Sequence, residues 1–374
     1  MHDAERGLFE LSRGRPLFLR AGKGAGLVAA VETLSVQALE TVRTAGAGPL
    51  RLVITAYRAR SMGLLPGSHN GENAALSLRL PEDVSVEEIV GLATSRGENP
   101  PLDVEPRPTD PVEESGLNLA RSGRLLPAIV SMPASLTGEG ELDELLRAGT
   151  ILQVTSDVVS RFTQASSEIL VPVSEAPVPL AEAGDARFTL FREGNGLHEH
   201  LAVTVGSRDG WPDPVPLRIH SACVTGDLFG SLRCDCGEQL RESIRVFSEL
   251  GGGVLLYMAH EGRSIGLANK LRAYAIQEEG LDTVDADCAL GFGADERSYG
   301  PAISILRALE VHRVRILTNN PLKVRALEEG GVQVVDRLPL HGSLNAHNLP
   351  YLSAKRLRSG HLIDGMLSRK LPDP

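Results

Sequence analysis

The sequence has few cysteines, no excess of positive charge and no long uninterrupted apolar run. Four cysteines in 374 residues do not suggest a disulfide framework, and three of them lie close together, which favours a metal site in a reducing compartment. The net charge of -10 argues against a nucleic-acid-binding protein, because such proteins usually carry a broad basic field. No apolar run is long enough to span a bilayer, and the first residues show no secretory signal. We therefore expect a cytoplasmic protein with neither a membrane nor a nucleic-acid partner.

The length of the chain allows two domains, each with its own hydrophobic core. A hydrophobic content of 42% and a charged content of 23% are ordinary for a globular protein. Residues 171–179 include three prolines, a composition typical of a linker. We expect a first domain of residues 1–170, a linker at residues 171–180 and a second domain of residues 181–374.

The first half alternates stretches of helical and extended character, which predicts an α+β domain. Short strands are expected at Leu17–Leu19 and Leu50–Ile54, and a helix is expected at Ser35–Thr44. The stretch Glu98–Pro111 is rich in proline and acidic residues, which indicates a surface loop. The pattern from Asp143 to Phe162 predicts one further helix.

The second half has the pattern of an α/β domain, with a mixed sheet flanked by helices. Strands are expected at Gly253–Met258, Val314–Leu317 and Val332–Val335. A helix at Leu322–Glu329, ended by two glycines, connects the last two strands into a strand-helix-strand unit. Another amphipathic helix is expected at Glu238–Leu250, and it also ends at glycines.

The strongest chemical signal is the set Cys223, Cys234 and Cys236. Three thiolates suit zinc, and three protein ligands leave the fourth tetrahedral position for water, whose pKa zinc lowers to about 7. The alternatives are a structural zinc site closed by His220 or Cys288, or three ordinary buried thiols. The spacing alone does not choose between a catalytic ion and these alternatives.

A second motif, His260–Leu267, follows the expected strand at Gly253–Met258 directly. Polar, glycine-bearing turns at the carboxyl ends of strands are where open α/β sheets bind ligands. Glu261 could accept hydrogen bonds from the N–H groups of a purine, and Arg263 could pair with phosphate. An ordinary turn with a surface ion pair is the alternative.

A third motif, Leu317–Lys323, joins a strand to a helix. Asn320 can cap that helix and Pro321 suits its first position. The unpaired N–H groups of such a helix start attract phosphate, and Lys323 adds a positive charge one turn into the helix. A well-capped helix without a ligand is the alternative.

A fourth motif, Gly291–Gly300, carries Asp295 and Arg297 within a loop. The two side chains could act as a base and a cation in acid–base and phosphoryl chemistry. A surface salt bridge is the alternative meaning of such a run.

The four motifs occur together in a run, Arg218–Leu340, that resembles GTP cyclohydrolase II almost throughout, and the stretches 345–348 and 351–356 resemble the same family. Four separate motifs in the family's order make a chance match improbable. The resemblance implies hydrolysis of GTP to 2,5-diamino-6-(5-phospho-ribosylamino)pyrimidin-4-one, formate and pyrophosphate, the first step of riboflavin synthesis. A homodimer is expected.

The resemblance also implies roles for individual residues. Cys223, Cys234 and Cys236 would bind one zinc ion per chain, which activates water for attack on C8 of the guanine. Arg297 is the family's proposed nucleophile toward the α-phosphate and Asp295 its proposed proton acceptor. Because a guanidinium stays protonated in proteins, Arg297 could equally act as an electrostatic clamp on phosphate. Magnesium is expected with the triphosphate. The family places a tyrosine at the reacting base and further residues against GTP; the matching positions are Tyr274, and Arg218, Ile219, His220, Ser221, Gln239, Glu261, Gly262, Arg263, Thr283, Thr318 and Lys323.

The chain departs from the family at three positions beside these residues. Ala222 stands where the family commonly has glutamate, so one polar contact beside the zinc is missing. His260 and Ser264 replace residues that are more often Gln, and Asn or Gly. Because the zinc ligands, Asp295 and Arg297 all remain, these departures bear on turnover and product partition more than on the class of reaction.

The first domain resembles a degenerate dihydroxybutanone phosphate synthase domain, through Gly7–Leu11, Gly14–Leu19 and its overall layout. That synthase needs an acidic loop to hold magnesium, but this chain has Arg20–Gly26 there, without a carboxylate. The family's Gly-His-Thr-Glu motif is replaced around Val112–Ser115, without histidine. We therefore predict a catalytically inactive domain that serves packing, dimerisation or regulation.

The sequence leaves three alternative functions open. One is a related cyclohydrolase that serves another pathway or stops at an incomplete product. Another is a zinc-stabilised sensor that binds GTP without turnover. The third is the full bifunctional enzyme, which the missing acidic loop opposes.

Overall fold

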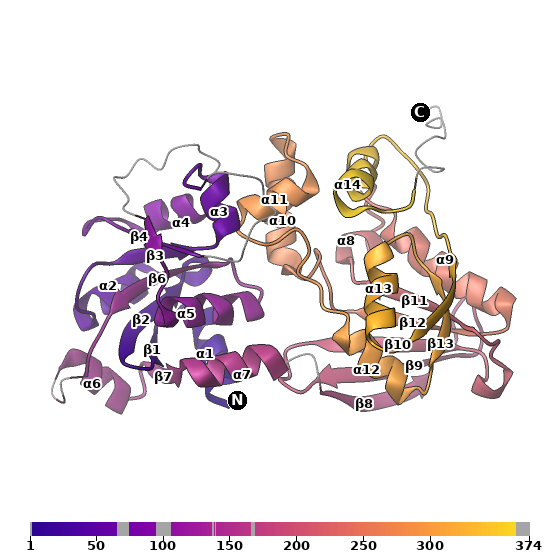
Figure 1. The fold of residues 1–374 in the computed structure, drawn as a ribbon, viewed down its shortest axis with the longest axis horizontal. Coiled ribbons are helices and arrows are strands. Elements are labelled where there is room, and N and C mark those ends of the chain that lie inside the picture. The colour runs from indigo at the N-terminus through magenta and orange to yellow at the C-terminus, as the bar shows by residue number, and fades with distance from the viewer. Residues whose placement is uncertain are drawn as a thin grey trace. The chain divides into compact units, whose positions relative to one another are not determined.

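The computed structural model describes residues 2–65, 75–94, 106–136, 138, 140–165 and 169–363. These residues form two compact units (Figure 1). The first unit contains the described residues up to Ala165 together with two later segments, Ala268–Leu281 and Asp285–Glu296. The second unit contains the remaining residues. The fold class is confirmed, because each unit is a mixed sheet flanked by helices.

The first unit is built on one sheet, in which the described strands follow the order β5-β4-β3-β6-β2-β1-β7. Neighbouring strands pair antiparallel except β1 and β7, which pair parallel. Its elements, including most of α10 and of α11, are α1 (His2–Ser12), β1 (Leu17–Ala21), β2 (Gly24–Ala30), η1 (Val31–Thr33), α2 (Val36–Ala45), β3 (Arg51–Ile54), α3 (Ala56–Ser61), β4 (Leu76–Arg79), α4 (Val86–Thr94), β5 (Pro106–Pro108), α5 (Pro111–Ser122), β6 (Ala128–Pro133), α6 (Glu141–Arg147), β7 (Leu152–Thr155), α7 (Ser156–Ala165), α10 (Gly266–Glu278) and α11 (Thr283–Ala289).

The first two expected strands and the helix between them are confirmed as β1, β3 and α2. The Ser35 hydroxyl caps α2 by accepting a hydrogen bond from the Ala38 N–H, and Leu39 and Val42 turn inward. Helices α1, α5 and α7 pack on one another, and their apolar side chains close a core with those of β1.

The prediction of a single helix from Asp143 to Phe162 is wrong in the middle of this range. Helix α6 ends at Arg147, and Gly149 follows in the left-handed region with φ +70. The chain then forms β7, which pairs parallel with β1 and buries Val154, before α7 begins. Helical spacing of apolar residues did not reveal this strand because it is only four residues long.

The expected surface loop at Glu98–Pro111 is also corrected at its end. Residues 98–105 lie outside the described residues, but Pro106–Pro108 form β5, which pairs antiparallel with β4 at the edge of the sheet. Proline lacks an N–H and is tolerated on edge strands. Pro111 is the first residue of α5, where Asp110 forms a capping box with Glu113.

The second unit is built on a second mixed sheet, in which the described strands follow the order β14-β13-β11-β12-β10-β9-β8. The pairs among β14, β13, β11 and β12 are parallel, and the remaining pairs are antiparallel. Its elements are β8 (Leu170–Pro177), β9 (Ala186–Glu193), β10 (Glu199–Val205), η2 (Arg208–Gly210), β11 (Val215–Ser221), α8 (Val224–Asp227), α9 (Cys236–Leu250), β12 (Gly253–Met258), α12 (Gly300–Ala308), β13 (Arg313–Leu317), α13 (Pro321–Glu329), β14 (Gln333–Leu338) and α14 (Leu349–Ser359).

The proline-rich stretch expected to be a linker is strand β8, the edge strand of the second sheet. Pro172 lies where the register with β9 shifts, so its missing N–H interrupts the ladder locally. The boundary between the units falls a few residues earlier, between Ala165 and Ser166. For the two families that the chain resembles, we propose domain limits of residues 1–170 and 181–374, with the linker at residues 171–180.

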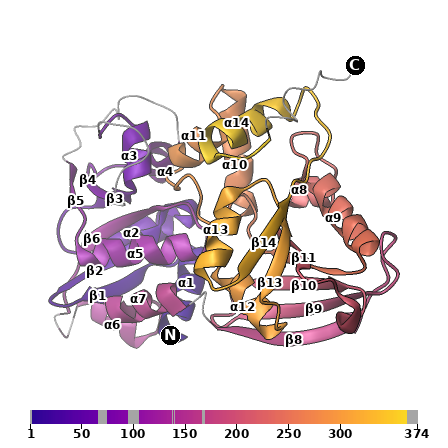
Figure 2. The same ribbon diagram turned by 45° about the vertical axis from the view of Figure 1, so that its right-hand side comes forward.

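Helices cover both faces of the second sheet (Figure 2). Strand β12 is buried on both sides: Val254 and Leu256 pack with α12 and α13, while Leu255 packs with α9 on the other face. Strands buried on both faces are typical of parallel α/β sheets. In the described part of the chain, no helix has the length and apolar character to cross a membrane.

Candidate active site

Three of the four motifs follow neighbouring parallel strands of the second sheet, namely β11, β12 and β13. Strand β11 lies between the other two, so the chain moves from β11 to β12 on one side and then returns to β13 on the other. Open α/β sheets bind ligands at the carboxyl ends of strands where the order reverses in this way. The motifs therefore meet at the expected position for a ligand.

The three cysteines form a compact cluster at this edge. Cys223 immediately precedes α8, Cys236 begins α9, and Cys234 lies in the turn between the helices. The three Sγ atoms lie within 4.8 Å of one another, and those of Cys223 and Cys234 are 3.7 Å apart. Within the part of the chain that the structure describes, this is the group of His, Cys, Asp and Glu side chains that could hold a metal. His220 and Cys288 are not members of it.

The thiols of Cys234 and Cys236 have raised pKa values. Hydrogen bonding with Cys223 is the largest cause for both other thiols, and it raises the pKa of Cys234 to about 11. Binding of a cation to three thiolates must therefore release protons.

The close approach of the sulfurs depends on glycine at position 226. A Cβ atom there would lie 2.6 Å from the Sγ of Cys234 and 3.1 Å from the Sγ of Cys223. A Cβ at Gly237 would likewise lie 2.3 Å from the carbonyl oxygen of Gly226, so this second glycine lets α8 and α9 pack closely.

We predict that Gly226→Ala lowers the affinity of the cluster for zinc about 10- to 100-fold, because the new methyl group pushes the sulfurs apart. Chelator competition, followed by measurement of the zinc content, tests this. Gly210→Ala is the control, since a Cβ there meets nothing within 4 Å. Equal zinc retention in both variants would contradict the prediction.

Asp227 connects the cysteine cluster to the sheet. Its Oδ2 accepts hydrogen bonds from the backbone N–H of Cys223 and the hydroxyl of Tyr257, both at 2.9 Å. Its Oδ1 lies 3.0 Å from Nε2 of His220, a buried ring that stacks on Tyr257. Burial is the main cause that lowers the pKa of His220, so the ring is neutral and serves to orient Asp227.

The turn after β12 is held against the cysteine cluster by Glu261. Its carboxylate accepts a hydrogen bond of 2.7 Å from the backbone N–H of Val224, the residue that follows Cys223. Gly262, Arg263 and Ser264 all have positive φ values, of 59, 58 and 74. A run of left-handed residues costs about 1–2 kcal/mol for each residue other than glycine, and such strain gathers at functional sites.

A chain of buried and half-buried polar groups runs from β11 to α14. Arg218 donates to the carbonyl oxygen of Leu317 at 2.9 Å and to Oε1 of Gln239 at 2.6 Å. Gln239 in turn donates to Asp235, which pairs with Lys355 at 3.5 Å. Burial lowers the pKa of Arg218 against the opposing charge of Asp235. Asp235 lies between two of the cysteines in sequence, so these cations border the cysteine cluster.

The motif after β13 also faces β11. Lys323 is buried, and its Nζ donates to the carbonyl oxygen of Ile219 at 2.6 Å. The Thr318 hydroxyl accepts from the N–H of Asn320, and Asn320 caps α13 by accepting from the N–H of Leu322. The capped helix expected from the sequence is confirmed, and its first turn lies at the same sheet edge as the cysteines.

Several positive charges affect the pKa of His361. Burial is the largest cause that lowers its pKa, to about 3, and the charges of Lys355, Arg297, Lys323 and Arg263 lower it further, in that order. Four cations therefore act on one neutral ring, and one of them, Lys355, pairs with Asp235, which lies between two of the cysteines in sequence. Such a cluster suits a ligand with several negative charges.

The lowered pKa of His361 predicts a pH dependence of stability. The ring binds a proton near pH 6.5 in the unfolded chain and only near pH 3 in the folded one, so the unfolded state is favoured as pH falls through this range. Denaturant titrations at pH 7 and pH 4.5 should show a smaller loss of stability in His361→Gln than in the wild type. Tripolyphosphate should reduce the difference, because its charge offsets the four cations. His2→Gln, at an exposed position, is the control, and equal losses in all three proteins would contradict the prediction.

The remaining predicted site residues are divided between the two units. Arg297 belongs to the second unit, where its guanidinium lies 3.4 Å from the hydroxyl of Ser221 and against the ring of Tyr299. Thr283, at the start of α11, also belongs to the second unit. Tyr274, on α10, and Asp295 belong to the first unit.

Sequence reasoning missed several residues that shape this site. Asp227 and Tyr257 were not predicted, although Asp227 stands four residues after Cys223, the spacing at which a side chain can return to a helix start. Lys355 was noted only as part of a resembling run. Nothing in the sequence links it to Asp235, 120 residues earlier.

Comparisons with known proteins agree with this geometry. The profile of the family described as GTP cyclohydrolase II matches residues 171–339. The chain is 38% identical to a GTP cyclohydrolase-2 of Xylella fastidiosa over 99% of its own length and 90% of that protein. It is 40% identical to a GTP cyclohydrolase-2 of Azospirillum brasilense over 97% of its length and 94% of that protein.

The chain is an enzyme of the GTP cyclohydrolase II family.

Members of the family differ in length. A GTP cyclohydrolase-2 of Histophilus somni is 46% identical over 51% of this chain and 88% of its own length, so it is too short to hold both domains. Among solved structures, RibBX, a two domain 3,4-dihydroxy-2-butanone 4-phosphate synthase from A. baumannii, is 15% identical, with a TM-score of 0.34, over 91% of this chain and 99% of that one.

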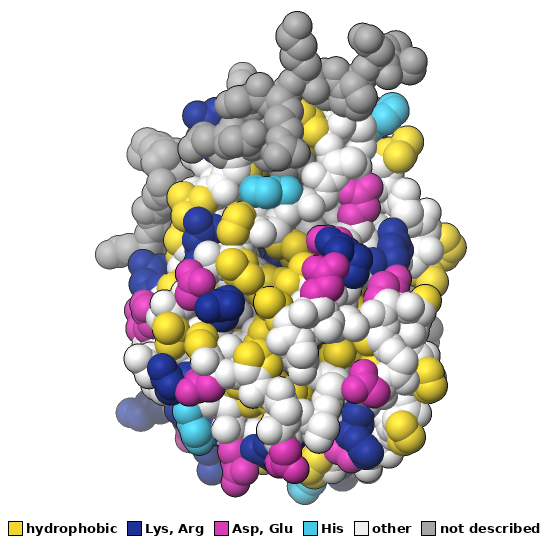
Figure 3. Space-filling model, turned by 90° about the vertical axis from the view of Figure 1, so that its right-hand side faces the viewer, with side chains coloured by type: hydrophobic (Ala, Val, Ile, Leu, Met, Phe, Trp, Pro, Cys, Tyr) yellow, Lys and Arg dark blue, Asp and Glu magenta, His cyan; other side chains and the backbone are white. Residues whose placement is uncertain are grey.

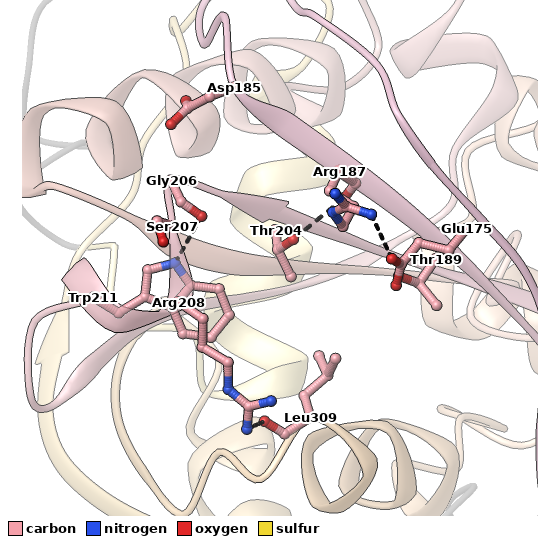
Figure 4. Close-up of a pocket in the computed structure, with 10 residues that line it drawn as sticks. All are labelled: Glu175, Asp185, Arg187, Thr189, Thr204, Gly206, Ser207, Arg208, Trp211 and Leu309. Atoms are coloured by element: carbon pink, nitrogen blue, oxygen red, sulfur yellow. Dashed lines mark hydrogen bonds and ion pairs between the residues drawn. The ribbon is translucent and has the colours of Figure 1, made fainter.

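A pocket of about 470 Å³ lies in the second unit (Figure 4). It is lined by Thr204 and Gly206, near the amino end of β12, whereas the cysteines lie at the carboxyl end. Its exposed Arg187 is already paired with Glu175. Figure 3 shows one face of the molecule, on which cationic and acidic side chains lie side by side. We assign neither feature to the reaction.

Proposed function

We propose that this enzyme opens the imidazole ring of GTP, giving 2,5-diamino-6-(5-phospho-ribosylamino)pyrimidin-4-one, formate and pyrophosphate, the first step of riboflavin synthesis. The observation that carries the proposal is the cluster of three cysteine sulfurs at the sheet edge where Arg218, Lys323 and Lys355 are also held. A metal site next to a polyanion site suits a reaction that hydrolyses the base and the phosphate of one nucleotide. The names of the full-length relatives support GTP as the substrate.

The cysteine cluster fits zinc. Thiolates are soft ligands that zinc accepts, and the 4.8 Å limit on the separation of the sulfurs allows them to share one ion. Asp227 and Glu261 fix the backbone on both sides of Cys223, as outer contacts do in metal sites. Zinc held by three thiolates retains a position for water and supplies that water with a pKa near 7. We propose one zinc ion per chain.

The protein side chains would bind and orient the nucleotide around that ion. Arg263, Lys323 and Arg297 supply positive charge for the triphosphate, which we propose enters with magnesium. Arg297 would stabilise charge at the α-phosphate, with the Ser221 hydroxyl keeping its guanidinium in place. Glu261 would accept N–H groups of the guanine, as the sequence suggests.

The further site assignments rest on the family resemblance alone. We propose that Asp295 accepts a proton during the reaction and that Tyr274 lies at the reacting base. The proposed contacts with GTP also include Arg218, Ile219, His220, Gln239, Gly262, Thr283 and Thr318. A homodimer in the cytoplasm remains a prediction from the sequence.

We propose that the first domain is catalytically inactive. Residues 20–26, where the related synthase has its acidic loop, span the end of β1, the hairpin turn and the start of β2, and contain no carboxylate. Glu113 is buried and is engaged by Arg107 and by its capping role at α5. These contacts support a structural use of that carboxylate. Formation of dihydroxybutanone phosphate from ribulose 5-phosphate by the purified protein would overturn this proposal.

The proposed reaction is tested by incubating the zinc-loaded protein with GTP and magnesium. Formate, pyrophosphate and the pyrimidine should appear in equal amounts over many turnovers. A GTP sensor would bind the nucleotide and release none of them. A related cyclohydrolase with an incomplete product would give a different mass in the pyrimidine fraction.

A further inference from the structure

Two segments of the cyclohydrolase sequence fold with the first unit. The family profile covers residues 171–339, which include Ala268–Leu281 and Asp285–Glu296, yet both segments belong to the compact unit of the N-terminal domain. The first segment carries Tyr274 and the second carries Asp295. The contacts that hold these segments are therefore contacts with the degenerate domain.

The end of the second segment is held by an ion pair. Nη2 of Arg121, on α5, lies 3.0 Å and 2.9 Å from the two carboxylate oxygens of Glu296, the residue next to Asp295. Both side chains are about three-quarters buried. Oε1 of Glu296 also accepts a hydrogen bond of 2.6 Å from the N–H of Gly293. Glu296 thereby closes the loop around Asp295 and fixes it to α5.

The middle of the same segment is held by buried groups at the start of α3. Nη1 of Arg58 donates to the carbonyl oxygen of Ala289 at 2.9 Å, and the Thr55 hydroxyl donates to that of Gly291 at 2.6 Å. Arg58 is 3% exposed, and burial lowers its pKa to about 10, so it remains charged at neutral pH. Gly291 has φ +93, and a Cβ there would lie 3.0–3.5 Å from atoms of Pro127, Thr55 and Arg58.

Helix α10, which carries Tyr274, is held by the loop after α5. The Asn269 amide donates to the carbonyl oxygen of Arg124 at 2.9 Å, and Asn269 is completely buried. Arg272 lies 3.3 Å from Glu32, whose same oxygen accepts the N–H of Leu126. The N-terminal domain thus contacts the backbone or side chains of both segments.

We propose that Arg121 is a positioning residue for the cyclohydrolase reaction: through its ion pair with Glu296 it fixes the neighbouring Asp295. This inference rests on the proposed function. The short relative from Histophilus somni cannot hold both domains, so this support is a property of the longer chain. A displacement of about 1 Å in a catalytic group can reduce turnover about 100-fold. We expect loss of the ion pair to reduce turnover by up to this factor.

The test compares Arg121→Met, Arg121→Lys and Arg15→Met in the full-length, zinc-loaded protein. Arg15 forms an exposed ion pair with Glu10 in the same unit and serves as the matched control. Arg121→Met should lower kcat for formate release 10- to 100-fold, with KM for GTP and zinc content within twofold of the wild type. Arg121→Lys should recover part of the loss, and Arg15→Met should behave as the wild type.

Hydrogen exchange supplies a readout that does not depend on turnover. Amides of residues 285–296 should exchange faster in Arg121→Met than in the wild type, while those of α9 stay unchanged. Wild-type kcat and wild-type exchange in Arg121→Met would overturn the inference. Equal loss in Arg15→Met would also overturn it, since the effect would then be general. If the wild type releases no formate, the proposed function fails, and the exchange rates still decide whether Arg121 fixes the segment.

Discussion

Cys234→Ser should remove zinc and lower formate release at least about a thousandfold, the largest effect that we expect from a single substitution. Serine is a poor zinc ligand at neutral pH, and without the ion water keeps a pKa near 15.7 instead of about 7. The Sγ of Cys234 also lies only 3.7 Å from that of Cys223, so the two thiols can share one ion. Zinc content and formate release are measured on the same preparation.

The control for this substitution is Cys288→Ser. Cys288 is fully buried and belongs to the first unit, outside the sulfur cluster. It should keep its zinc and its turnover, apart from a modest loss of stability. Circular dichroism distinguishes a catalytic zinc ion from a structural one. A folded but inactive Cys234→Ser supports a catalytic ion, whereas global unfolding would favour a structural one, and retained turnover would contradict the assignment.

Arg297→Ala should lower the release of pyrophosphate and formate about a thousandfold while GTP still binds. An arginine that stabilises phosphoryl transfer contributes about 10³–10⁵ in kcat in other enzymes. Three other cations remain beside His361, so binding of the triphosphate should fall much less than turnover. Single-turnover kinetics and equilibrium binding of GTP measure the two quantities separately.

Arg297→Lys distinguishes an electrostatic clamp from a nucleophile. A clamp should be restored in part by the ammonium, and no covalent guanylyl adduct should appear by mass spectrometry of the wild type during turnover. Arg192→Ala is the control, because Arg192 forms an exposed ion pair with Glu199 in the same unit. An adduct on Arg297 would instead support the nucleophile, and unchanged turnover in Arg297→Ala would contradict both roles.

The sequence predicts where the motifs lie in the second sheet, because they follow strands. Once Gly253–Met258 and Val314–Leu317 are recognised as strands, parallel pairing brings the residues after them to one edge. The spacing of the cysteines similarly restricts how far their sulfurs can separate, since they frame two short turns and a helix start. Local pattern and sheet topology are sufficient for this part.

The parts that the sequence did not predict depend on contacts between distant residues. Strand β8 contains prolines that a central strand excludes, and only its place at the sheet edge explains them. Strand β7 forms because β1 offers it a partner more than 130 residues away in sequence. Lys355 meets Asp235, and Arg121 meets Glu296, without any local signal. Such pairings follow from tertiary packing, which overrides local pattern.

The coordination of zinc in the purified enzyme tests the central claim most directly. X-ray absorption at the zinc edge should show three sulfur ligands at about 2.3 Å and one oxygen at about 2.0–2.2 Å. In Cys234→Ser the zinc signal should be lost. A fourth sulfur or an imidazole nitrogen around the ion, or protein that is fully active with no zinc, would contradict the account.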